Sequence, residues 1–589
     1  MNMARLLTAL ALCVSVAVAA TAPADNVFER AEAPVAEGRI DQLVFGRLAE
    51  LNLKPVLCSD AVFVRRAYLD IIGMLPTAKE ARDFINDPDR ANKRRALIDR
   101  LLERNEYADY WAMKWGDVLR IKAEFPVNLW PNAAQAYHRW VRASLVANKP
   151  YDQFARELLT SSGSNFRVGP VNFYRAIQDK KPESIAAAVA LTLMGSRLET
   201  WPADRRAGMT AFFAQVGYKA TSEWKEEHVF WDPLGASAAP GETAPGRAGI
   251  PAIADAVNLA AKAVAAEPKK KDPLAAIFPD GRRVELSPDR DPREVFADWL
   301  ITPQNPWFAQ AIVNRAWAWL LGRGIVHEPD DIRPDNPPGN PALLAYLQSE
   351  FVASHYDLKR LYRLILNSQT YQLSSMPRND SREAEANFAS YPLRRLDAEV
   401  LIDAINQITG SSDLYTSAIP EPFTYIPEGK PAVTIADGSI TSPFLALFGR
   451  SARATGMVNE RDHKPVPAQW LHLLNSSHIQ RKLEQGPKLR ALLDPARPAT
   501  VIADELYLTI LSRLPTPEER KAIDVPIAAT PAPATGRPVP AAAVSPTKAG
   551  KSPAQKKGPP PRGPSPKRRE DWLDVAWALI NSNEFLYRH

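Results

Sequence analysis

The chain has 589 residues, of which 46% are hydrophobic and 24% are charged, and its formal net charge at pH 7 is +6. This composition is ordinary for a soluble globular protein, so it excludes a fully disordered chain, a collagen and a polytopic membrane protein. The length suits about two to four domains of roughly 100–200 residues each.

The N-terminus has the pattern of a secretory signal over residues 1–20. Arg5 supplies a positive charge, an apolar run from Leu6 to Val18 follows, and small residues continue to Ala22, as a signal peptidase requires. The apolar run is shorter than the roughly 20 residues that a transmembrane helix needs. We therefore expect an exported protein, periplasmic or extracellular, whose mature chain has no membrane span.

Removal of this signal leaves Cys58 as the single cysteine of the mature sequence. An exported chain with one thiol cannot form an internal disulfide, so its stability has to come from an apolar core. Because Cys58 precedes a predicted helix, we expect it to be buried as a small apolar side chain.

Helical periodicity dominates the rest of the chain, and the predicted fold class is mainly α. The first predicted helix covers residues 60–72 and is ended by Gly73 and Pro76, and the capping box that runs from Thr77 to Glu80 begins the next one. Further predicted helices cover residues 91–102, 107–121, 133–146, 151–159, 182–194, 206–216, 292–300, 308–321, 341–353, 358–366, 397–408, 468–475, 502–511 and 572–580.

The distribution of Pro, Gly and Ala predicts two helical domains. The N-terminal helical domain spans residues 38–232, and the C-terminal helical domain spans 291–524 plus 570–589. Between them, residues 233–290 form an irregular connection with a short hairpin expected near Asp280 and Gly281.

The positive charge lies in one segment near the C-terminus. Residues 525–569 hold nine basic residues, no acidic residue and 12 of the 53 prolines, so the rest of the mature chain is net acidic. Such a segment cannot bury enough apolar surface to fold, and we expect a disordered basic linker. Two interpretations of the linker remain open: it is a solubilising insertion that has no partner, or it binds an anionic surface. In an exported protein we do not expect it to bind nucleic acid.

A final amphipathic helix is predicted after the linker, over residues 571–586. Trp572 and Leu579 fall on one of its faces, and left exposed this face would promote aggregation. A long loop costs little more to close than a short one, so we expect the helix to dock beside the helix at 502–511.

Two long motifs resemble known families. Phe-Val-Arg-Arg-Ala-Tyr-Leu-Asp and Gly-Met-Leu-Pro-Thr, within residues 63–77, resemble the opening of domain-of-unknown-function family 1549. Asn-Pro-Trp-Phe-Ala and Leu-Gly-Arg-Gly-Ile-Val, within residues 305–326, resemble family 1553. The resemblance covers most of residues 40–215 and 291–589. It implies a secreted, planctomycete-type protein of a cytochrome-c-associated family, with no established reaction.

The chain departs from these relatives where many of them attach haem. They carry Cys-x-x-Cys-His before an Ala-Phe-Phe stretch, whereas residues 194–202 here contain no cysteine, and residues 451–461 of the second domain also lack one. Haem has no thioether attachment point at either place. We therefore predict a protein without a cofactor, from a branch that lost the haem motif.

The sequence contains none of the common catalytic or metal-binding motifs. It has no His-Glu-x-x-His, no Gly-x-Ser-x-Gly, no phosphate-binding glycine loop and no dinucleotide fingerprint. His472 and His478 are six residues apart, which places them on different faces of a helix. One cysteine cannot build a zinc-thiolate cluster, so we predict no metal site.

Two polar constellations are the candidate ligand-binding sites. Each has a structural alternative: a core helix with an internal ion pair for the first set, and an ion-pair network between helices for the second. An aromatic pair beside a carboxylate and a guanidinium would suit a sugar or a peptide. The first set is Trp111, Trp115, Asp117 and Arg120. The second, which matches the resembled family pattern, is Asn314, Arg315, Trp317, Asp330, Asp331, Asn336, Arg394, Arg395 and Glu399.

The leading functional hypothesis is an exported helical binding or scaffold protein without a cofactor. Its partner would be an envelope polymer or another protein. The first alternative is an enzyme that acts on envelope or extracellular polymers, with Asp330 or Asp331 as the acid/base group. The second is a haem-less partner of a cytochrome-c-type system.

Overall fold

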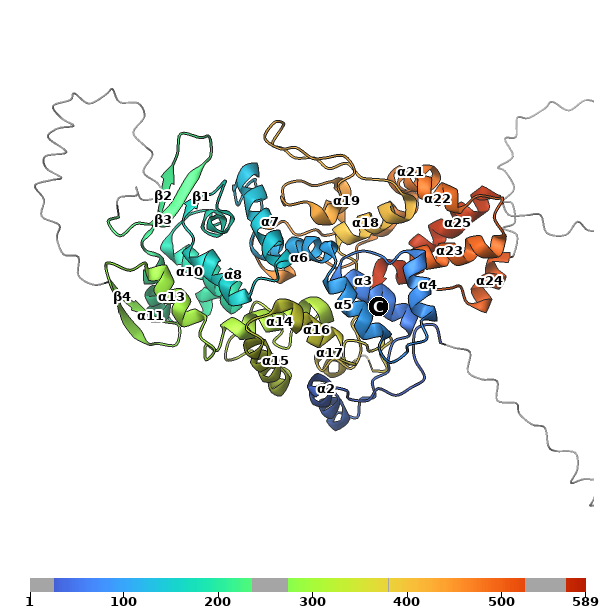
Figure 1. Cartoon of the computed structure of the whole chain (residues 1–589), viewed down its shortest axis with the longest axis horizontal. Helices are drawn as coiled ribbons and strands as arrows, with labels where there is room; N and C mark the ends of the chain where they lie inside the picture. Colours follow the sequence, from blue (N-terminus) through green and yellow to red (C-terminus); the bar gives the residue numbers. More distant parts are fainter. Residues whose placement is uncertain (1–25, 236–273, 380, 525–567) are drawn as a thin grey trace, which may run out of the picture.

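The computed structural model describes residues 26–235, 274–379, 381–524 and 568–589. Helices dominate these segments, as predicted, and the strands form only small sheets (Figure 1). The predicted signal, most of the predicted connection and nearly all of the predicted linker lie outside the described residues. Within the described part of the chain, no helix is both long and apolar enough to cross a membrane.

The first half is a series of helices separated by short turns. The predicted capping box is present: the Thr77 hydroxyl accepts from the backbone N–H of Glu80, and the Glu80 carboxylate accepts from the Thr77 N–H at 2.8 Å. The helices are α2 (Arg39–Glu50), α3 (Asp60–Ile71), α4 (Ala78–Asn86), α5 (Lys93–Leu102), α6 (Asn105–Val118), α7 (Pro131–Val146), α8 (Tyr151–Thr160), η1 (Gly169–Val171), α9 (Asn172–Arg175), α10 (Pro182–Met194), η2 (Leu198–Thr200), α11 (Ala203–Thr210) and η3 (Ala211–Phe213).

The second half is also helical, with more irregular loops. Gly322 ends α14 at a φ of +74°, a conformation that glycine adopts without strain. The helices are α13 (Pro292–Leu300), α14 (Phe308–Leu321), α15 (Pro341–Ala353), α16 (Leu358–Leu366), α17 (Arg382–Ala386), α18 (Ala398–Thr409), η4 (Ala432–Thr434), α19 (Pro443–Leu447), η5 (Val458–Glu460), α20 (Pro467–Asn475), α21 (Ser477–Gln485), α22 (Pro487–Leu492), α23 (Ala499–Leu511), α24 (Pro517–Asp524), α25 (Arg569–Ile580) and α26 (Asn583–Leu586).

The predicted helix at residues 206–216 is wrong in its second half. Helix α11 ends at Thr210, and the chain continues through η3 into a strand, because Phe212 and Phe213 pack against Phe296 with ring centroids 5.3 Å apart. The segment that follows pairs as a hairpin that the sequence analysis missed. The strands of this antiparallel sheet, in the order β1-β3-β2, are β1 (Gly163–Ser164), β2 (Val216–Ala220) and β3 (Glu227–Trp231).

Two further antiparallel strand pairs complete the fold. β4 (Leu274–Ile277) and β5 (Arg283–Leu286) form the hairpin predicted near Asp280 and Gly281. β6 (Arg394–Arg395) pairs with β7 (Tyr587–Arg588), so residues at the far end of the sequence return to the middle of the second half.

The apolar cores of the two halves are continuous, and α3 is part of this shared core. Ten of the twelve residues of α3 are buried. Two of them are arginines that donate to backbone carbonyls of the second half: Arg65 to Ile510 and Phe585, and Arg66 to Tyr371, Leu373 and His589. The first and last parts of the chain therefore lie side by side, with α4 against α23 (Figure 1).

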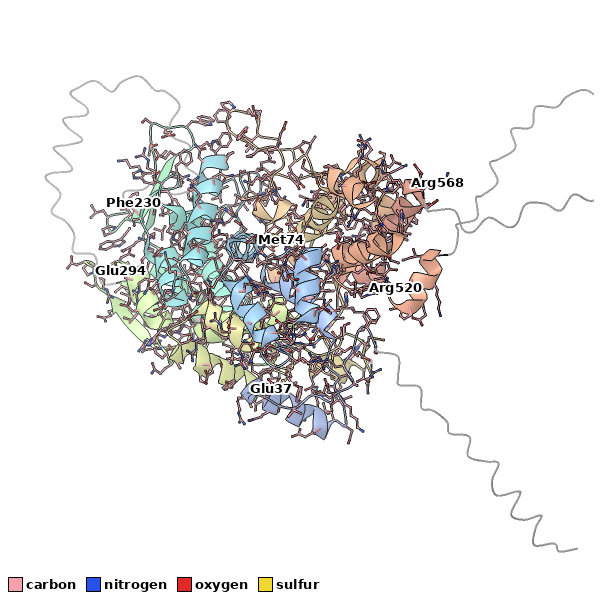
Figure 2. The ribbon with its side chains drawn as sticks, turned by 45° about the vertical axis from the view of Figure 1, so that its right-hand side comes forward. Glu37, Met74, Phe230, Glu294, Arg520 and Arg568 are labelled. Atoms are coloured by element: carbon pink, nitrogen blue, oxygen red, sulfur yellow. The ribbon has the colours of Figure 1, made fainter. Side chains whose placement is uncertain are left out.

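The docking of the last long helix is confirmed. Helix α25 packs against α23 and α21, and Trp572 is only 2% exposed. Cys58 is buried, as predicted. Figure 2 shows Arg520 of α24 and Arg568, just before α25, at one end of the molecule, opposite Phe230 and Glu294.

Candidate functional site

A network of buried ion pairs joins α6 to α18 and to the loop after α19. Asp117 of α6 accepts from the Nε of Arg453 at 3.0 Å and also from Arg461. Arg461 continues to Glu399 of α18 at 2.7 Å, and Arg450 donates to the same carboxylate at 3.1 Å. These side chains are at most 6% exposed. Burial alone would raise the pKa of Glu399, but the guanidiniums of Arg461 and Arg450 outweigh it and lower the pKa to about 2.

A second group of charges meets at Asp397, just before α18. Lys114 donates to Asp397 Oδ2 at 2.8 Å, and Arg588 donates to the same oxygen at 2.7 Å. The other end of the Arg588 guanidinium donates to Asp70 of α3, also at 2.7 Å. Burial lowers the pKa of Lys114 to about 8, against the attraction of Asp397. Charged side chains from both halves of the chain therefore pair with one another in the protein interior.

The two tryptophans of the first predicted site are core residues. Trp111 stacks on Tyr362 with ring centroids 4.2 Å apart, and Trp115 meets Trp319 edge-on at 5.7 Å. Both tryptophans are buried, and the Trp111 indole N–H donates to the carbonyl of Ile71. Neither ring offers a free face to a ligand.

The structure also separates Asp117 from Arg120. Asp117 belongs to the buried network, whereas α6 ends at Val118 and Arg120 adopts a left-handed backbone conformation with a φ of +56°. Arg120 lines a different cavity. The first set is therefore not brought together as one site.

Arg315 and Asp330 are the buried centre of the second predicted set. Arg315 donates to Asp330 Oδ1 at 2.7 Å and to the carbonyl of Thr192 at 2.8 Å. The other oxygen of Asp330 accepts from the backbone N–H of Val458 at 2.6 Å. Both carboxylate oxygens are occupied, and the pair joins α14 to the end of α10 and to η5.

Asn314 and Trp317 have structural contacts on the same helix, α14. Asn314 donates to the carbonyl of Val326 and accepts from the N–H of that residue, both at 2.9 Å, which holds the turn after α14. Trp317 is fully buried and meets Phe388 edge-on at 5.1 Å.

Asp331 and Asn336 lie in the loop after α14, close to the surface. Asn336 donates to the backbone carbonyl of Asp331 at 2.9 Å, and the Asp331 carboxylate lies 3.3 Å from Arg333. This loop, rather than the buried Arg315 pair, faces an open pocket through residues 332–335.

The two arginines of β6 donate hydrogen bonds to backbone carbonyls of other segments. Arg394 donates to the carbonyl of Trp319 at 2.9 Å, near the end of α14. Arg395 donates to the carbonyls of Phe448 and Asp462, at 2.8 and 2.7 Å. The second set is thus spread over several structural contacts and does not line one cleft.

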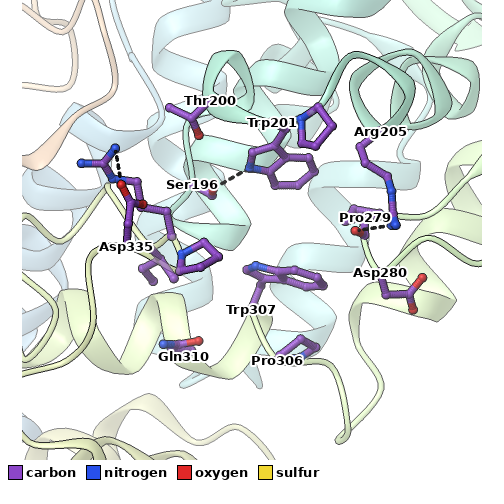
Figure 3. Close-up of a pocket in the computed structure, with 14 residues that line it drawn as sticks. Ser196, Thr200, Trp201, Arg205, Pro279, Asp280, Pro306, Trp307, Gln310 and Asp335 are labelled. Atoms are coloured by element: carbon purple, nitrogen blue, oxygen red, sulfur yellow. Dashed lines mark hydrogen bonds and ion pairs between the residues drawn. The ribbon is translucent and has the colours of Figure 1, made fainter.

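An open pocket that the sequence analysis missed lies between the two halves (Figure 3). Its cavity has a volume of about 780 Å³. One wall consists of Ser196, η2 and the start of α11, and the opposite wall consists of the start of α14 and residues 332–335. The turn between β4 and β5 closes one side.

Two tryptophans provide the aromatic surface of this pocket. Trp201 and Trp307 have ring centroids 6.3 Å apart and planes inclined by 35°. Both rings are partly exposed, and Figure 3 shows them on facing walls of the cavity. The indole N–H of Trp201 donates to the Ser196 hydroxyl at 2.8 Å, which fixes the orientation of the ring.

Charged and amide side chains surround the tryptophans. Arg205 donates to the carbonyl of Pro279 at 3.1 Å, and the exposed Asp280 accepts from Trp299 at 2.9 Å. Gln310 of α14 also lines the pocket. Flat apolar faces with a few polar groups around them are typical of sites for polar ligands that carry an apolar face.

A local signal for this pocket exists in the sequence. Trp201 precedes Pro202, and Trp307 follows Pro306, at positions where α11 and α14 begin. A tryptophan at a helix start lies outside the periodic apolar face of the helix. What the sequence does not reveal is that the two helix starts face each other.

The residues present do not fit a covalently attached haem. The segment that corresponds to the attachment motif of the resembled family contributes Ser196, Thr200 and Trp201 to the pocket wall, and none of them can form a thioether. Cys58 lies elsewhere and is fully buried.

His472 and His478 lie side by side, contrary to the prediction. Helix α20 ends at Asn475 and Ser476 caps α21, so the chain bends between the two histidines. The ring nitrogens His472 Nε2 and His478 Nδ1 are 3.3 Å apart, and His478 bonds to Asp413 at 3.0 Å. Among the described residues, no group of three or more His, Cys, Asp or Glu has a geometry that could hold a metal ion.

Comparison with known families matches both halves of the chain. Residues 39–201 match the model of a family described as a protein of unknown function (DUF1549, PSCyt2), and residues 292–525 match that of another (DUF1553, PSD1). No curated protein and no solved structure matches the chain. The two matches agree, in identity and order, with the resemblance of the sequence motifs.

Proposed function

The chain belongs to the proteins of unknown function that carry a DUF1549 domain followed by a DUF1553 domain, and we propose that it is an exported binding protein whose ligand site is the pocket between these domains. One observation carries the proposal: each domain supplies one tryptophan to the same pocket. Trp201 is the last residue of the first family match, and Trp307 lies near the start of the second.

The ligand that suits this pocket is a saccharide unit of an envelope or extracellular polymer. The apolar face of a sugar ring packs on an indole, while its hydroxyls need carboxylates, amides and guanidiniums around it. Asp280, Gln310 and Arg205 supply such groups. A volume of about 780 Å³ lies within the range of roughly 300–1,000 Å³ that small-molecule sites have.

Export is part of the proposal and is supported by the sequence of residues 1–20. The test is the N-terminal sequence of the protein recovered from the periplasm or the medium of its own cells. We expect it to begin shortly after residue 20, and a chain that still begins at Met1 would contradict export through this signal.

The contacts of Asp330 indicate a structural role for this residue rather than a catalytic one. An acid/base group has to reach the substrate with a free oxygen. Asp330 is buried, and Arg315 and the Val458 N–H occupy its two oxygens. Asp330, one of the two acid/base candidates of the enzyme hypothesis, is thus committed to structural contacts, whereas Asp331 lies in the loop near the surface.

Calorimetric titration with soluble oligomers of glucose, mannose and N-acetylglucosamine tests the saccharide site. We expect one series to bind, and Trp307→Ala and Trp201→Ala to weaken binding at least tenfold, because each removes a stacking face. Trp224→Ala is the matched control, since Trp224 is 68% exposed and lies outside the pocket. If no oligomer binds, or if the pocket variants bind as the wild type does, the proposal is wrong.

A further inference from the structure

A second pocket lies behind the wall that Trp201 helps to form. Its cavity has a volume of about 410 Å³. The segment of residues 196–201 separates the two cavities: Ser196, Thr200 and Trp201 line the first, whereas Arg197 and Glu199 line the second. Arg120, which the sequence analysis singled out, lines the second cavity too.

The two arginines of this second pocket have unsatisfied buried nitrogens. The Nε atoms of Arg120 and Arg197 are both buried and have no hydrogen-bond partner in the described part of the chain. Both residues are half-buried, and the ion pairs between described residues include neither guanidinium, whereas the fully buried Arg315 and Arg453 have carboxylate partners. A half-buried guanidinium whose Nε–H is buried without a partner carries a desolvation cost that an anion would offset.

The protein supplies little compensating charge to Arg120. Burial lowers the pKa of Arg120, and the opposing attraction of Tyr137 and Glu460 does not restore it. The Tyr137 hydroxyl is itself buried and lacks a hydrogen-bond partner among the described residues. Arg120 lines the cavity, so its guanidinium is available there as a donor.

The acidic groups of the pocket do not fill this role. Asp179 accepts from the N–H of Lys181 and from the Ser184 hydroxyl, which directs it to the start of α10. Glu199 is exposed to solvent. Neither carboxylate lies within ion-pair distance of Arg197 or Arg120 in the described structure.

We propose that this second pocket binds the oxyanion group, a carboxylate or a phosphate, of a small ligand between Arg120 and Arg197. The planar guanidinium of arginine donates two parallel hydrogen bonds to either group, which an ammonium cannot do. The carbon part of the ligand would contact Ile177, Leu191 and Met457, which line the same cavity. The site is independent of the saccharide pocket and does not rest on it.

The test is calorimetric titration of the full chain with inorganic phosphate and, separately, with succinate, at constant ionic strength. We expect at least one of them to bind with one-to-one stoichiometry. Binding of phosphate alone assigns the site to phosphorylated ligands, and binding of succinate alone assigns it to carboxylates. If neither binds at millimolar concentration, the proposal is overturned.

Variants decide whether the bound anion occupies this pocket. Arg197→Gln should weaken binding at least tenfold, and it should fold because the buried Nε of Arg197 has no hydrogen-bond partner among the described residues to lose. Arg197→Lys keeps the charge without the planar fork and should lose affinity too. Arg206→Gln, on the exposed side of α11, is the matched control. Wild-type affinity in Arg197→Gln would refute the assignment.

Discussion

Asp70 and Asp397, one from each family domain, are bridged by a single guanidinium: Arg588 donates to Asp70 Oδ1 and to Asp397 Oδ2, each at 2.7 Å. The three side chains are at most 3% exposed. Ionic strength screens buried pairs far less than surface pairs, so this bridge should persist at high salt. It gives the two domains a shared polar centre inside a continuous apolar core.

Removal of this bridge should destabilise the protein strongly. Arg588→Ala removes the cation that two buried carboxylates share, and breaking a buried pair in this way costs about 3–5 kcal/mol. Urea unfolding monitored by circular dichroism measures the loss. Arg568→Ala is the control, because the Arg568 side chain is 76% exposed and should contribute less than about 1 kcal/mol. Equal stability of both variants would show that the bridge contributes nothing.

The ion pairs of Glu399 should make the protein sensitive to acid. Its pKa is about 2 in the folded protein and 4.5 ordinarily, so the folded state favours the charged form. The resulting stabilisation is complete above pH 4.5 and is lost as the pH falls toward 2.

Glu399→Gln isolates this contribution. At pH 7 the variant should be less stable than the wild type by about 3–5 kcal/mol, because Arg450 loses its carboxylate partner and Arg461 keeps Asp117 but loses Glu399. The difference should shrink between pH 4.5 and pH 2.5 in urea titrations, with Glu50→Gln on the exposed face of α2 as the control. A difference that is constant with pH would contradict the assigned pKa.

Burial of Trp572 should dominate the docking of α25. Trp572→Ala removes a fully packed indole and should lower the free energy of unfolding by about 3–5 kcal/mol. Trp577→Ala on the exposed side of the same helix should cost less than about 1 kcal/mol. Thermal and urea unfolding of both variants provide the comparison.

Cleavage within the predicted linker should leave the last peptide bound. The peptide 568–589 is held by Trp572, by the strand pairing of β7 and by Arg588. We expect a protease site inserted in residues 525–567 to give two fragments that elute together in gel filtration and separate only in denaturant. Release of the peptide under native conditions would rule out stable docking.

The protein should carry no covalent haem, because residues 194–202 and 451–461 contain no cysteine. We expect no Soret absorption after acid–acetone extraction of protein made in a host that matures c-type cytochromes. A c-type cytochrome produced in the same cells is the positive control. A Soret band that stays with the denatured chain would contradict the prediction.

The helices could be predicted because their signals are local. Thr77 and Glu80 are three residues apart, and their reciprocal bonds form within one turn. The missed hairpin follows from the packing of Phe212 and Phe213 against the distant Phe296, and the misplaced histidines follow from the cap at Ser476. The ends of these helices depend on the contacts that side chains make in the folded protein, and the helical periodicity of the sequence does not indicate those contacts.

The candidate sites could not be predicted in the same way. Asp117 and its partner Arg453 are separated by 336 residues, and nothing near either residue indicates the other. Trp201 and Trp307 carry a local signal, but only the packing of the two domains makes them one pocket. Sequence reasoning found reactive side chains and could not tell which of them the fold would bury.

The position of β7 also has a consequence for the order in which the protein can mature. Arg588 follows Asp70 by 518 residues, and Arg65 donates to the carbonyls of Ile510 and Phe585. A ribosome makes the DUF1549 segment first, and domains commonly fold in that order during synthesis. Here the early segment contains charged groups whose partners are made several hundred residues later, so these buried contacts cannot form when the first domain has just been made. We expect a nascent first domain that stays open and depends on chaperones until residues near 588 arrive.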